Sequence, residues 1–240
     1  MKNSPSAREL LQAGASALGL SIPSELLPLF GRYYDELAFW NRIAGITSYR
    51  KEKDVLIYMF LDSMAGVKVL DGVPGSLLLD VGTGGGFPGL PMKMLRPAVN
   101  LVLLDSSEKK VRFLEHLVRE LALDGVTVLR GRIQKLAESS PYREKFDVMC
   151  IRALAPLKEL VEMVFPCLSV GGHALAWKGP SVREEIHEAK GICVEVGAQW
   201  GGIFSYRLPF VDEERHIVAI KKVRTTAETL LGKRRKPQKH

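Results

Sequence analysis

The residues best suited to ligand chemistry form a glycine-rich turn between residues 77 and 89, with the sequence LLLDVGTGGGFPG. An apolar stretch that ends near Asp80 leads into the glycines, and a second apolar stretch of helical character follows them. Glycine permits positive φ angles and lets the backbone approach a ligand closely. The first turn of a helix presents free N–H groups that bind carboxylates or phosphates. The turn therefore predicts a binding site for a cofactor with an acidic group.

A second acidic residue, Asp105, ends the apolar run 100–104. It lies about 20 residues beyond the glycine turn, the spacing at which an acid after the second strand accepts hydrogen bonds from ribose hydroxyls. This position supports any adenosine-containing cofactor and does not choose among them.

Two classes of adenosine cofactor are compatible with the turn. From residue 84 it matches the dinucleotide pattern G-x-G-x-x-G. Asp80, however, stands just before the first glycine, where it would repel an anionic pyrophosphate but not a zwitterion with a cationic sulfonium. A nicotinamide-dependent oxidoreductase also needs a hydride-transfer constellation such as Tyr-x-x-x-Lys, and neither Tyr142 nor Tyr206 has a lysine four residues on. The pattern favours S-adenosylmethionine, with the oxidoreductase as the alternative.

Short apolar runs alternate with helical stretches from about residue 75 to residue 190. Strands that are apolar throughout and separated by helices indicate a parallel sheet covered on both faces. The double glycine at 171–172 is expected to form a turn from helix to strand. The expected strands are 76–81, 100–104, 126–129, 146–151 and 173–177, and the expected helices are 88–95, 107–121, 156–167 and 181–190.

Two further strand-like runs, 202–208 and 216–221, follow with no convincing helix between them. They predict an antiparallel hairpin at one edge of the sheet. Such a finish is typical of methyltransferases rather than of dinucleotide-binding domains. The predicted fold class is therefore α/β: a Rossmann-like class I methyltransferase sheet, mostly parallel, with a C-terminal antiparallel hairpin and an N-terminal helical extension.

The first 65 residues are expected to be helical and to pack on the main domain. One apolar stripe steps by three or four residues, which places its members on one helix face: Leu26, Phe30, Tyr33, Leu37 and Trp40. The predicted organisation is an N-terminal helical extension (1–65), an S-adenosylmethionine-binding methyltransferase domain (66–222) and a basic disordered tail (223–240).

The net charge of +7 comes from the end of the chain. Residues 221–240 contain eight lysines and arginines against one acid, Glu228, and so account for the whole net charge. Such a segment is either a solvated end or a means of holding a polyanion without a preformed groove. Both interpretations stay open on sequence alone.

The composition is that of an ordinary globular chain, with 46% hydrophobic and 25% charged residues. No apolar run approaches the roughly 20 residues of a membrane span, and the start lacks the apolar core of a signal peptide. The three cysteines form no CxxC pair, which predicts buried thiols rather than a disulfide framework or a zinc site. We expect a cytoplasmic monomer without membrane association or bound metal.

The glycine turn and several other stretches resemble one family. The segment GTGGGFPGLP (82–91) resembles the glycine loop of the RsmG (GidB) family, which methylates N7 of a guanine in the decoding region of 16S rRNA. Its Phe-Pro-Gly-x-Pro extension is more specific than the glycines. The likeness covers roughly residues 25–222, in order and spacing, through WNR (40–42), FLDS (60–63), LLDS (103–106), RALAP (152–156), WKG (177–179) and ERHIV (214–218).

The resemblance implies S-adenosylmethionine as the cofactor and 16S rRNA or the small ribosomal subunit as the partner. At position 134 the family usually has glutamate, whereas Gln134 bonds the adenine amino group without charge. The family's Asn-Leu-Thr stands here as Ala44-Gly45-Ile46-Thr47, so no role is assigned there. Together with Asp105, the candidate cofactor-binding residues are Gly82, Gly84, Phe87, Ile133, Gln134 and Arg152.

Other interpretations of single residues remain. Arg152 is alternatively a surface ion-pair partner, and Asp62 and Ser63 alternatively cap or turn a helix. His216 is more often structural than catalytic at the start of a strand.

Methylation of guanine N7 needs no general base, because N7 carries a lone pair and no proton. The site has to align N7, the methyl carbon and sulfur, and to exclude water. We therefore name no catalytic residue. Asp80 is a candidate to stabilise the purine cation, and Lys178, Arg215 and His216 are candidates to meet RNA phosphates or guanine O6. The alternatives are an inactive rRNA-binding factor of the same fold and a methyltransferase with another substrate.

Overall fold

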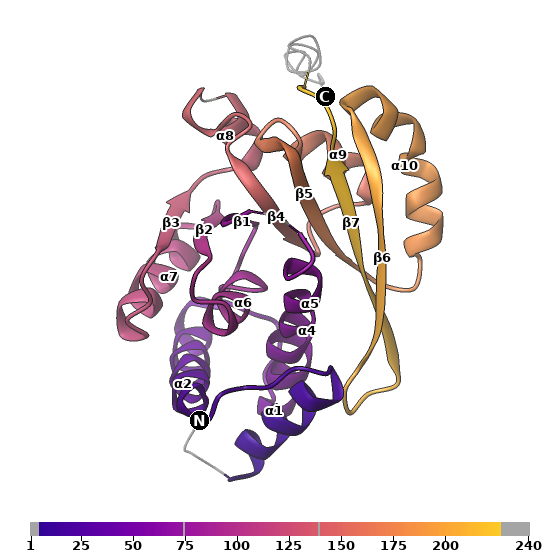
Figure 1. Cartoon of the computed structure of the whole chain (residues 1–240). Coiled ribbons are helices and arrows are strands. Elements are labelled where there is room, and N and C mark those ends of the chain that lie inside the picture. Colours follow the sequence, from indigo (N-terminus) through magenta and orange to yellow (C-terminus); the bar gives the residue numbers. More distant parts are fainter. Residues whose placement is uncertain (1–4, 74, 139, 227–240) are drawn as a thin grey trace, which may run out of the picture.

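The computed structural model describes residues 5–73, 75–138 and 140–226. Seven strands form one sheet in the order β3-β2-β1-β4-β5-β7-β6 (Figure 1). The first five strands of the chain run parallel, and β7 is antiparallel to both β5 and β6. The strands are β1 (Leu77–Val81), β2 (Asn100–Asp105), β3 (Val126–Arg130), β4 (Phe146–Arg152), β5 (Leu168–Lys178), β6 (Ala198–Leu208) and β7 (Glu213–Lys222). The predicted fold class is confirmed.

A hydrophobic core lies on each face of the sheet, because successive side chains of a strand point to opposite faces. Leu78 packs into the core shared with the N-terminal helices, α6 (Gly89–Leu95) and α7 (Glu108–Glu120). Its neighbour Leu79 packs into the core shared with α8 (Ile133–Glu138), α9 (Leu157–Val164) and α10 (Val182–Val196). Both cores hold the sheet rigidly beneath the loops that follow its strands.

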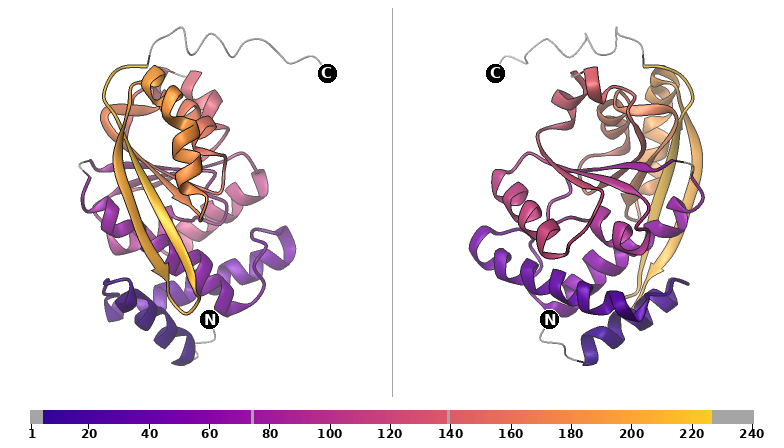
Figure 2. Two further views of the ribbon diagram at one scale, coloured as in Figure 1. Left: turned by 90° about the vertical axis from the view of Figure 1, so that its right-hand side faces the viewer. Right: turned by 60° about the vertical axis from the view of Figure 1, so that its left-hand side comes forward.

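The N-terminal helices form a layer across the end of the sheet at which the parallel strands finish (Figures 1 and 2). The stripe predicted on α2 is confirmed, since Phe30, Tyr33 and Leu37 are buried. The helical stretch continues to Leu70, so the proposed division between residues 65 and 66 falls within it. These elements are α1 (Pro5–Ala17), η1 (Ser24–Leu26), α2 (Leu27–Ala44), α3 (Glu52–Val55), the π-helix η2 (Leu56–Leu61), α4 (Asp62–Met64) and α5 (Gly66–Leu70).

The sequence predicted a turn from helix to strand at the double glycine. In the structure both glycines lie inside β5 instead. The pairing of β4 with β5 jumps from Phe146↔Leu168 to Val148↔His173, which marks a bulge in β5. Gly171 has φ +87°, and a Cβ on Gly172 would lie 2.8 Å from the carbonyl oxygen of Asp147. The glycines therefore permit a strand bulge.

Helix α10 passes through Gly191 and ends at Gly197, which adopts φ +72°. The sequence placed the end of this helix too early, because glycine in a helix costs only about 1 kcal/mol. Helix α8 was not predicted, and a 3-10 turn, η3 (Ser140–Tyr142), follows it.

Strand β7 ends at Lys222, on the edge of the sheet opposite the carboxyl ends of the parallel strands, because β7 is antiparallel to β5. The Lys222 side chain is fully buried, and its Nζ donates to the carbonyl oxygens of Phe165 (2.7 Å) and Leu168 (2.9 Å). Lys222 therefore belongs to the fold and not to the basic tail. Of the predicted tail, residues 227–240 lie outside the described residues.

Within the described parts of the chain, no helix has the length and apolarity needed to cross a membrane. Cys150, Cys167 and Cys193 are buried and form no disulfide, as predicted. Burial raises the pKa of the Cys193 thiol to about 11, so this cysteine is not a reactive thiolate at neutral pH.

Candidate functional site

Two cavities meet at the carboxyl ends of the parallel strands and share Ala153. The first, of about 410 Å³, is called the glycine-loop cavity and is lined by Val81, Gly82, Leu104, Asp105, Ser106, Lys110, Gly131, Arg132, Ile133, Gln134, Ala153, Leu154 and Met163. The second, of about 490 Å³, is called the tyrosine cavity and is lined by Ser48, Tyr49, Tyr58, Asp62, Arg152, Ala153, Trp177, Lys178, Gly179, Glu185 and Arg215. Both volumes lie in the range of about 300–1,000 Å³ usual for small-molecule sites.

The glycine loop follows β1 and takes a conformation that requires glycine. Gly82, Gly84 and Gly86 have φ angles of +70°, +60° and +96°, in the left-handed region that side chains other than glycine rarely adopt. A Cβ on Gly84 would meet nothing closer than 3.9 Å. This part of the backbone therefore faces open space in which a ligand can approach it.

Asp80 fixes the loop from beneath. Its carboxylate is fully buried, and Oδ2 accepts hydrogen bonds from Thr83 Oγ1 (2.6 Å) and from the N–H of Gly89 (2.7 Å). Burial raises the pKa of Asp80 to about 6, against the lowering effect of these two hydrogen bonds and of the Arg152 charge. Asp80 lines neither cavity. The suggestion that it touches the purine cation is therefore not supported, and its role is to hold the loop.

Asp105 joins the glycine loop to the end of β2. Oδ2 accepts a hydrogen bond from the N–H of Gly84 (2.9 Å), and Oδ1 accepts one from the N–H of Ser107 (2.9 Å). A carboxylate offers about four acceptor sites, so Asp105 can accept further hydrogen bonds from a ligand in the cavity that it lines. The nearest cation is Lys110, with Nζ 4.0 Å from Oδ2.

Ile133 and Gln134 begin α8 and line the glycine-loop cavity. Ile133 is buried, and Gln134 Nε2 donates to Met163 Sδ at 2.9 Å. Four of the seven residues predicted to bind the cofactor thus line one cavity: Gly82, Asp105, Ile133 and Gln134.

The other three predicted residues are not among those that line this cavity. Gly84 is tied to Asp105 through its N–H. Phe87 is buried beneath the loop, with its ring stacked on Tyr33 (centroids 5.0 Å apart) and in edge contact with Phe60 (5.0 Å). Arg152 lines the tyrosine cavity instead. Phe87 therefore supports the loop, and Arg152 stands on the neighbouring cavity.

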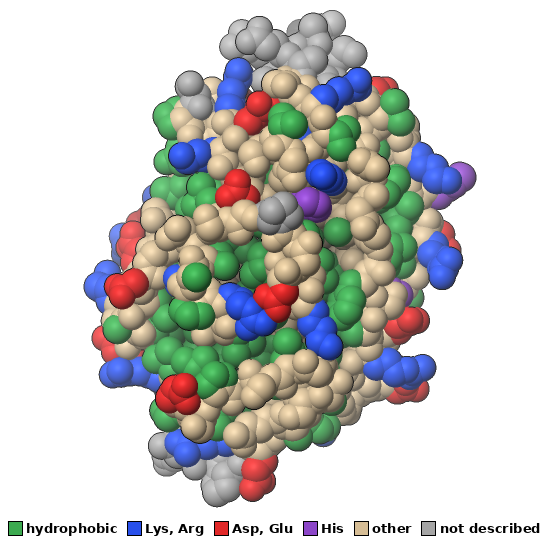
Figure 3. All heavy atoms as spheres, in the orientation of Figure 1, with side chains coloured by type: hydrophobic (Ala, Val, Ile, Leu, Met, Phe, Trp, Pro, Cys, Tyr) green, Lys and Arg blue, Asp and Glu red, His purple; other side chains and the backbone are tan. Residues whose placement is uncertain are grey.

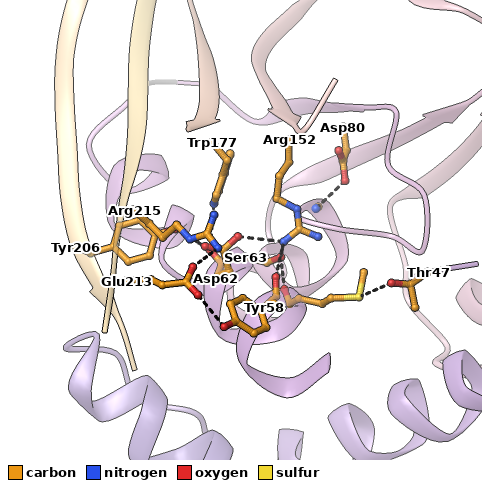
Figure 4. Close-up of polar contacts among 12 residues, drawn as sticks. Thr47, Tyr58, Asp62, Ser63, Asp80, Arg152, Trp177, Tyr206, Glu213 and Arg215 are labelled. Carbon is orange, nitrogen blue, oxygen red and sulfur yellow. Dashed lines mark hydrogen bonds and ion pairs between the residues drawn. The ribbon is translucent and has the colours of Figure 1, made fainter. Parts of the chain in front are cut away.

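Arg152 is anchored by the N-terminal helical stretch. Its Nη1 donates to the carbonyl oxygen of Tyr58 (3.2 Å), to Asp62 Oδ2 (3.2 Å) and to Ser63 Oγ (3.3 Å) (Figure 4). The other carboxylate oxygen of Asp62 accepts from the Tyr206 hydroxyl at 2.7 Å. The Arg152 side chain is only 16% exposed, so its ion pair is interior rather than superficial. Asp62 and Ser63 therefore hold Arg152 in place, and neither makes the helix-capping hydrogen bond that was the alternative interpretation.

The C-terminal hairpin completes the tyrosine cavity. The Tyr58 hydroxyl donates to Glu213 Oε1 (2.7 Å), and Arg215 Nη2 donates to Glu213 Oε2 (2.6 Å). Figure 4 shows Arg152 and Arg215 reaching the Tyr58–Ser63 segment from opposite sides. Tyr58 and Glu213 were not predicted as site residues from the sequence. The family-like stretches FLDS (60–63) and ERHIV (214–218) lie next to them, but a sequence stretch does not show which residues meet in the fold.

Lys178 and His216 both make contacts with neighbouring side chains or backbone of the protein. Lys178 Nζ donates to the Ala155 carbonyl oxygen and pairs with Glu185 Oε2, both at 2.7 Å. His216 is buried, with Nδ1 2.9 Å from Ser205 Oγ, as the structural interpretation held. No group of three or more His, Cys, Asp or Glu side chains in the described ranges is arranged to hold a metal ion.

A mostly parallel sheet with a C-terminal hairpin, a glycine loop after β1 and an acid after β2 defines a methyltransferase of the class I fold. Among solved structures, a SAM dependent methyltransferase from Aquifex aeolicus has the same fold, with a TM-score of 0.51 at 22% identity over 71% of this chain and 93% of that chain.

The sequence comparisons identify the family. The model described as rRNA small subunit methyltransferase G (GidB) matches residues 27–218. The ribosomal RNA small subunit methyltransferase G of Caldanaerobacter subterraneus subsp. tengcongensis is 38% identical over 215 residues, which is 90% of each chain. That of Carboxydothermus hydrogenoformans is 40% identical over 210 residues, 88% of this chain and 89% of the relative. The chain belongs to the rRNA small subunit methyltransferase G family, and the resemblance seen in its sequence is confirmed.

Proposed function

We propose that the chain transfers a methyl group from S-adenosylmethionine to N7 of a guanine in 16S rRNA, in the cytoplasm where small ribosomal subunits assemble. Family membership supports an rRNA methyltransferase. The choice of N7 as the acceptor rests on the state of the carboxylates around the tyrosine cavity.

The glycine-loop cavity suits S-adenosylmethionine. Asp105 has acceptor capacity left for the ribose hydroxyls, and the carbonyl of Gln134 offers an acceptor for the adenine amino group. The open space at Gly84 leaves the loop backbone accessible. When bound, the cofactor supplies a methyl group on a cationic sulfur with a neutral leaving group. The residues of the chain have to orient it and exclude water.

Both carboxylates that line the tyrosine cavity are occupied by neighbouring groups. Asp62 is held between Tyr206 and Arg152. Glu185 Oε2 accepts from the N–H of Leu157 (2.9 Å) and pairs with Lys178 (2.7 Å). Each is already paired with a cationic side chain, so neither stands free over the cavity as a general base. An acceptor atom that carries no proton, such as guanine N7, fits this arrangement, whereas N1 or N2 would require a base. This is the observation that carries the proposal.

The tyrosines near the cavity are also unsuited to act as bases. Hydrogen bonding to Glu213, with some burial, raises the pKa of Tyr58. Burial and the neighbouring Asp62 raise the pKa of Tyr206. Both phenols therefore stay protonated at neutral pH and serve as hydrogen-bond donors.

The test is methyl transfer to ribosomal RNA. Small subunits from cells that lack the gene are incubated with the protein and tritium-labelled S-adenosylmethionine, and N7-methylguanosine is then mapped on the RNA. We expect one modified guanine that is absent from the untreated subunits, and little transfer by Asp105→Ala at low cofactor concentration. Label at another position of guanine would overturn the N7 assignment, and subunit binding without transfer would favour an inactive rRNA-binding factor.

We also propose that the basic C-terminal segment adds RNA affinity. The face of the protein shown in Figure 3 intersperses Lys and Arg with Asp and Glu and carries no continuous basic surface. Contacts to phosphate from a basic segment make binding fall with salt. The segment follows β7, which ends at the sheet edge opposite the two cavities, and we expect base recognition to reside in the folded domain.

Deletion of residues 227–240 tests this role. We expect unchanged cofactor affinity and an unchanged methylation site, with a log affinity against log salt plot shallower by about one unit per lost phosphate contact. Replacement of the four basic residues 233–236 by glutamine is the matched control of equal length. The truncation keeps Arg224, which donates to the carbonyl oxygens of Val194 and Glu195. Equal salt slopes for all three proteins would show that the segment is only a solvated end.

A further inference from the structure

The tyrosine cavity is bordered by four parts of the chain that are distant in sequence. The N-terminal region supplies Tyr49, from the loop between α2 and α3, and Tyr58, from η2. The loop after β4 supplies Ala153, the end of β5 supplies Trp177, and the hairpin supplies Arg215. Ala153 adopts φ +53° and lines both cavities. A group seated in the tyrosine cavity therefore lies next to the glycine-loop cavity, where the methyl donor would be.

An aromatic surface forms one wall. The rings of Tyr49 and Tyr58 stack with centroids 5.3 Å apart and an angle of 6° between their planes. Asn41 fixes the Tyr49 segment, because its Nδ2 donates to the Tyr49 carbonyl oxygen (3.1 Å) and its Oδ1 accepts from the N–H of Thr47 (2.8 Å). Tyr58 lies on the π-helix η2, a rare conformation that occurs often at functional sites. Aromatic rings of this kind stack on unpaired bases.

Arg215 is a cationic side chain of this cavity with donor capacity to spare. Its Nη2 is bonded to Glu213, its Cζ lies 5.9 Å from the centroid of the Tyr58 ring, and its Nε is buried without a hydrogen-bond partner among the described residues. Lys178 is committed to Ala155 and Glu185. The Arg215 side chain is 30% exposed. A guanidinium carries five N–H donors and Glu213 engages Nη2, so the N–H groups of Nη1 remain for a ligand in the cavity.

On the premise of the function proposed above, we propose that Arg215 donates a hydrogen bond to O6 of the target guanine and that the base stacks on the Tyr49 side of the Tyr49–Tyr58 pair, since Tyr58 itself already contacts Tyr49 and Arg215. With N7 turned toward the methyl donor, O6 is the neighbouring acceptor on the same edge of the base. Adenine carries an amino donor at that position, so a guanidinium there selects guanine. The base has to be unpaired, because the major groove of A-form RNA is too deep and narrow for side chains to reach N7.

Glu213 is a positioning residue in this arrangement. It holds the Tyr58 hydroxyl with one oxygen and Arg215 with the other. It also neutralises the guanidinium beside a base that becomes cationic on methylation, which removes a repulsion that would otherwise raise the barrier. Its effect is therefore on the methyl-transfer step and not on the affinity for RNA.

The experiment measures single-turnover methyl transfer to small subunits at saturating protein and cofactor, with cofactor affinity and thermal midpoint recorded for each variant. We expect Arg215→Ala to lower the rate about tenfold to a hundredfold, the usual effect of losing a charged hydrogen bond, and Arg215→Lys to restore part of it. Arg207→Ala is the matched control, because Arg207 is a hairpin arginine paired with Asp212 outside the cavity; we expect its rate within about twofold of the parent.

Glu213→Gln keeps a hydrogen-bonding side chain but removes the charge. We expect it to slow transfer while the affinity for subunits stays equal or rises. An unchanged rate for Arg215→Ala, or an equal fall for Arg215→Ala and Arg207→Ala, would overturn the assignment of Arg215. An unchanged rate for Glu213→Gln would overturn the role of Glu213. Absence of transfer by the parent protein would instead refute the proposed function, so the two failures are distinguishable.

Discussion

The two adjacent cavities are held together in different ways. In the glycine-loop cavity the supporting hydrogen bonds run over short stretches of chain, as from Gly89 to Asp80 or from Gly84 to Asp105. In the tyrosine cavity they join residues far apart, since Arg152 meets Asp62 and Tyr58 meets Glu213. The first cavity therefore depends on the conformation of one loop, whereas the second depends on how the N-terminal helices and the hairpin pack.

Their electrostatics differ as well. Beneath the glycine loop, the Asp80 carboxylate is buried with one oxygen that has no partner in the described structure. Around the tyrosine cavity, each carboxylate is paired with a cationic side chain or a phenol, as Asp62 is with Arg152 and Tyr206. Loss of one member of such a pair leaves a buried charge uncompensated. Beneath the glycine loop, by contrast, the protonation of Asp80 alone changes the stability.

The largest effect on stability is expected when the ion pair beside the tyrosine cavity is broken. Asp62→Ala leaves Arg152 as an unpaired charge, because the pair is interior, with 16% and 8% of the two side chains exposed. We expect the free energy of unfolding to fall by about 3–5 kcal/mol, measured by urea denaturation. Asp71→Ala is the control, since it removes the exposed partner of Arg96 and should cost about 1 kcal/mol or less. Equal losses in the two variants would mean that the Arg152–Asp62 pair is effectively solvated.

The sequence predicted the sheet and the glycine-loop cavity because both follow from local pattern. Apolar runs and their spacing determine the strands, and a turn after a strand places its residues at the carboxyl edge. Asp105 follows from its position at the end of a strand, whereas the contacts at Gly82, Ile133 and Gln134 came from the family resemblance.

The tyrosine cavity could not be predicted in the same way. Nothing local to Tyr58 indicates that its hydroxyl meets Glu213, because that contact exists only after the hairpin packs on the N-terminal helices (Figure 1). The predicted contact of Arg152 with the cofactor came from the family resemblance. The resemblance gave no sign that Arg152 is held by Asp62. The errors in the fold have a similar origin. The expected turn included Gly172 and the expected helix stopped before Gly191, whereas β5 and α10 continue through these two glycines.

The second prediction tests the glycine-loop cavity. Asp105→Ala removes the proposed acceptor for the ribose hydroxyls and releases the N–H of Gly84. We expect S-adenosylmethionine binding to weaken by about 1.5–3 kcal/mol, measured by calorimetry, with the affinity for small subunits unchanged. Asp105→Asn keeps one acceptor oxygen and should lose less. Unchanged cofactor affinity in a folded Asp105→Ala protein would remove Asp105 from the site.

The third prediction uses the raised pKa of Asp80, about 6 against an ordinary value of 3.8. The native state then binds a proton that the unfolded state does not bind between these pH values, so this group makes stability fall as pH rises from about 4 to 6. Compared with Asp80→Asn, the parent should gain about 1–2 kcal/mol of unfolding free energy between pH 7 and pH 5. Urea denaturation of both proteins at these two pH values measures the difference. Parallel pH profiles would place the pKa of Asp80 near its ordinary value.

The smallest effect is expected at Gln134, which shares a cavity with Asp105 but carries no charge. Its amide donates only to the Met163 sulfur, a weak acceptor, and its carbonyl oxygen is the atom suited to the adenine amino group. Glutamate supplies the same oxygen and is ionised throughout pH 6–8, since its ordinary pKa is about 4.3. We therefore expect Gln134→Glu to bind S-adenosylmethionine within about threefold of the parent, the loss of less than about 1 kcal/mol, with no new pH dependence in calorimetry at pH 6, 7 and 8. Gln134→Ala is the control that reports whether the side chain touches adenine. A large loss of affinity for Gln134→Glu, or a pH dependence that the parent lacks, would show that the negative field of Asp105 extends across the whole cavity and that its two walls do not act independently.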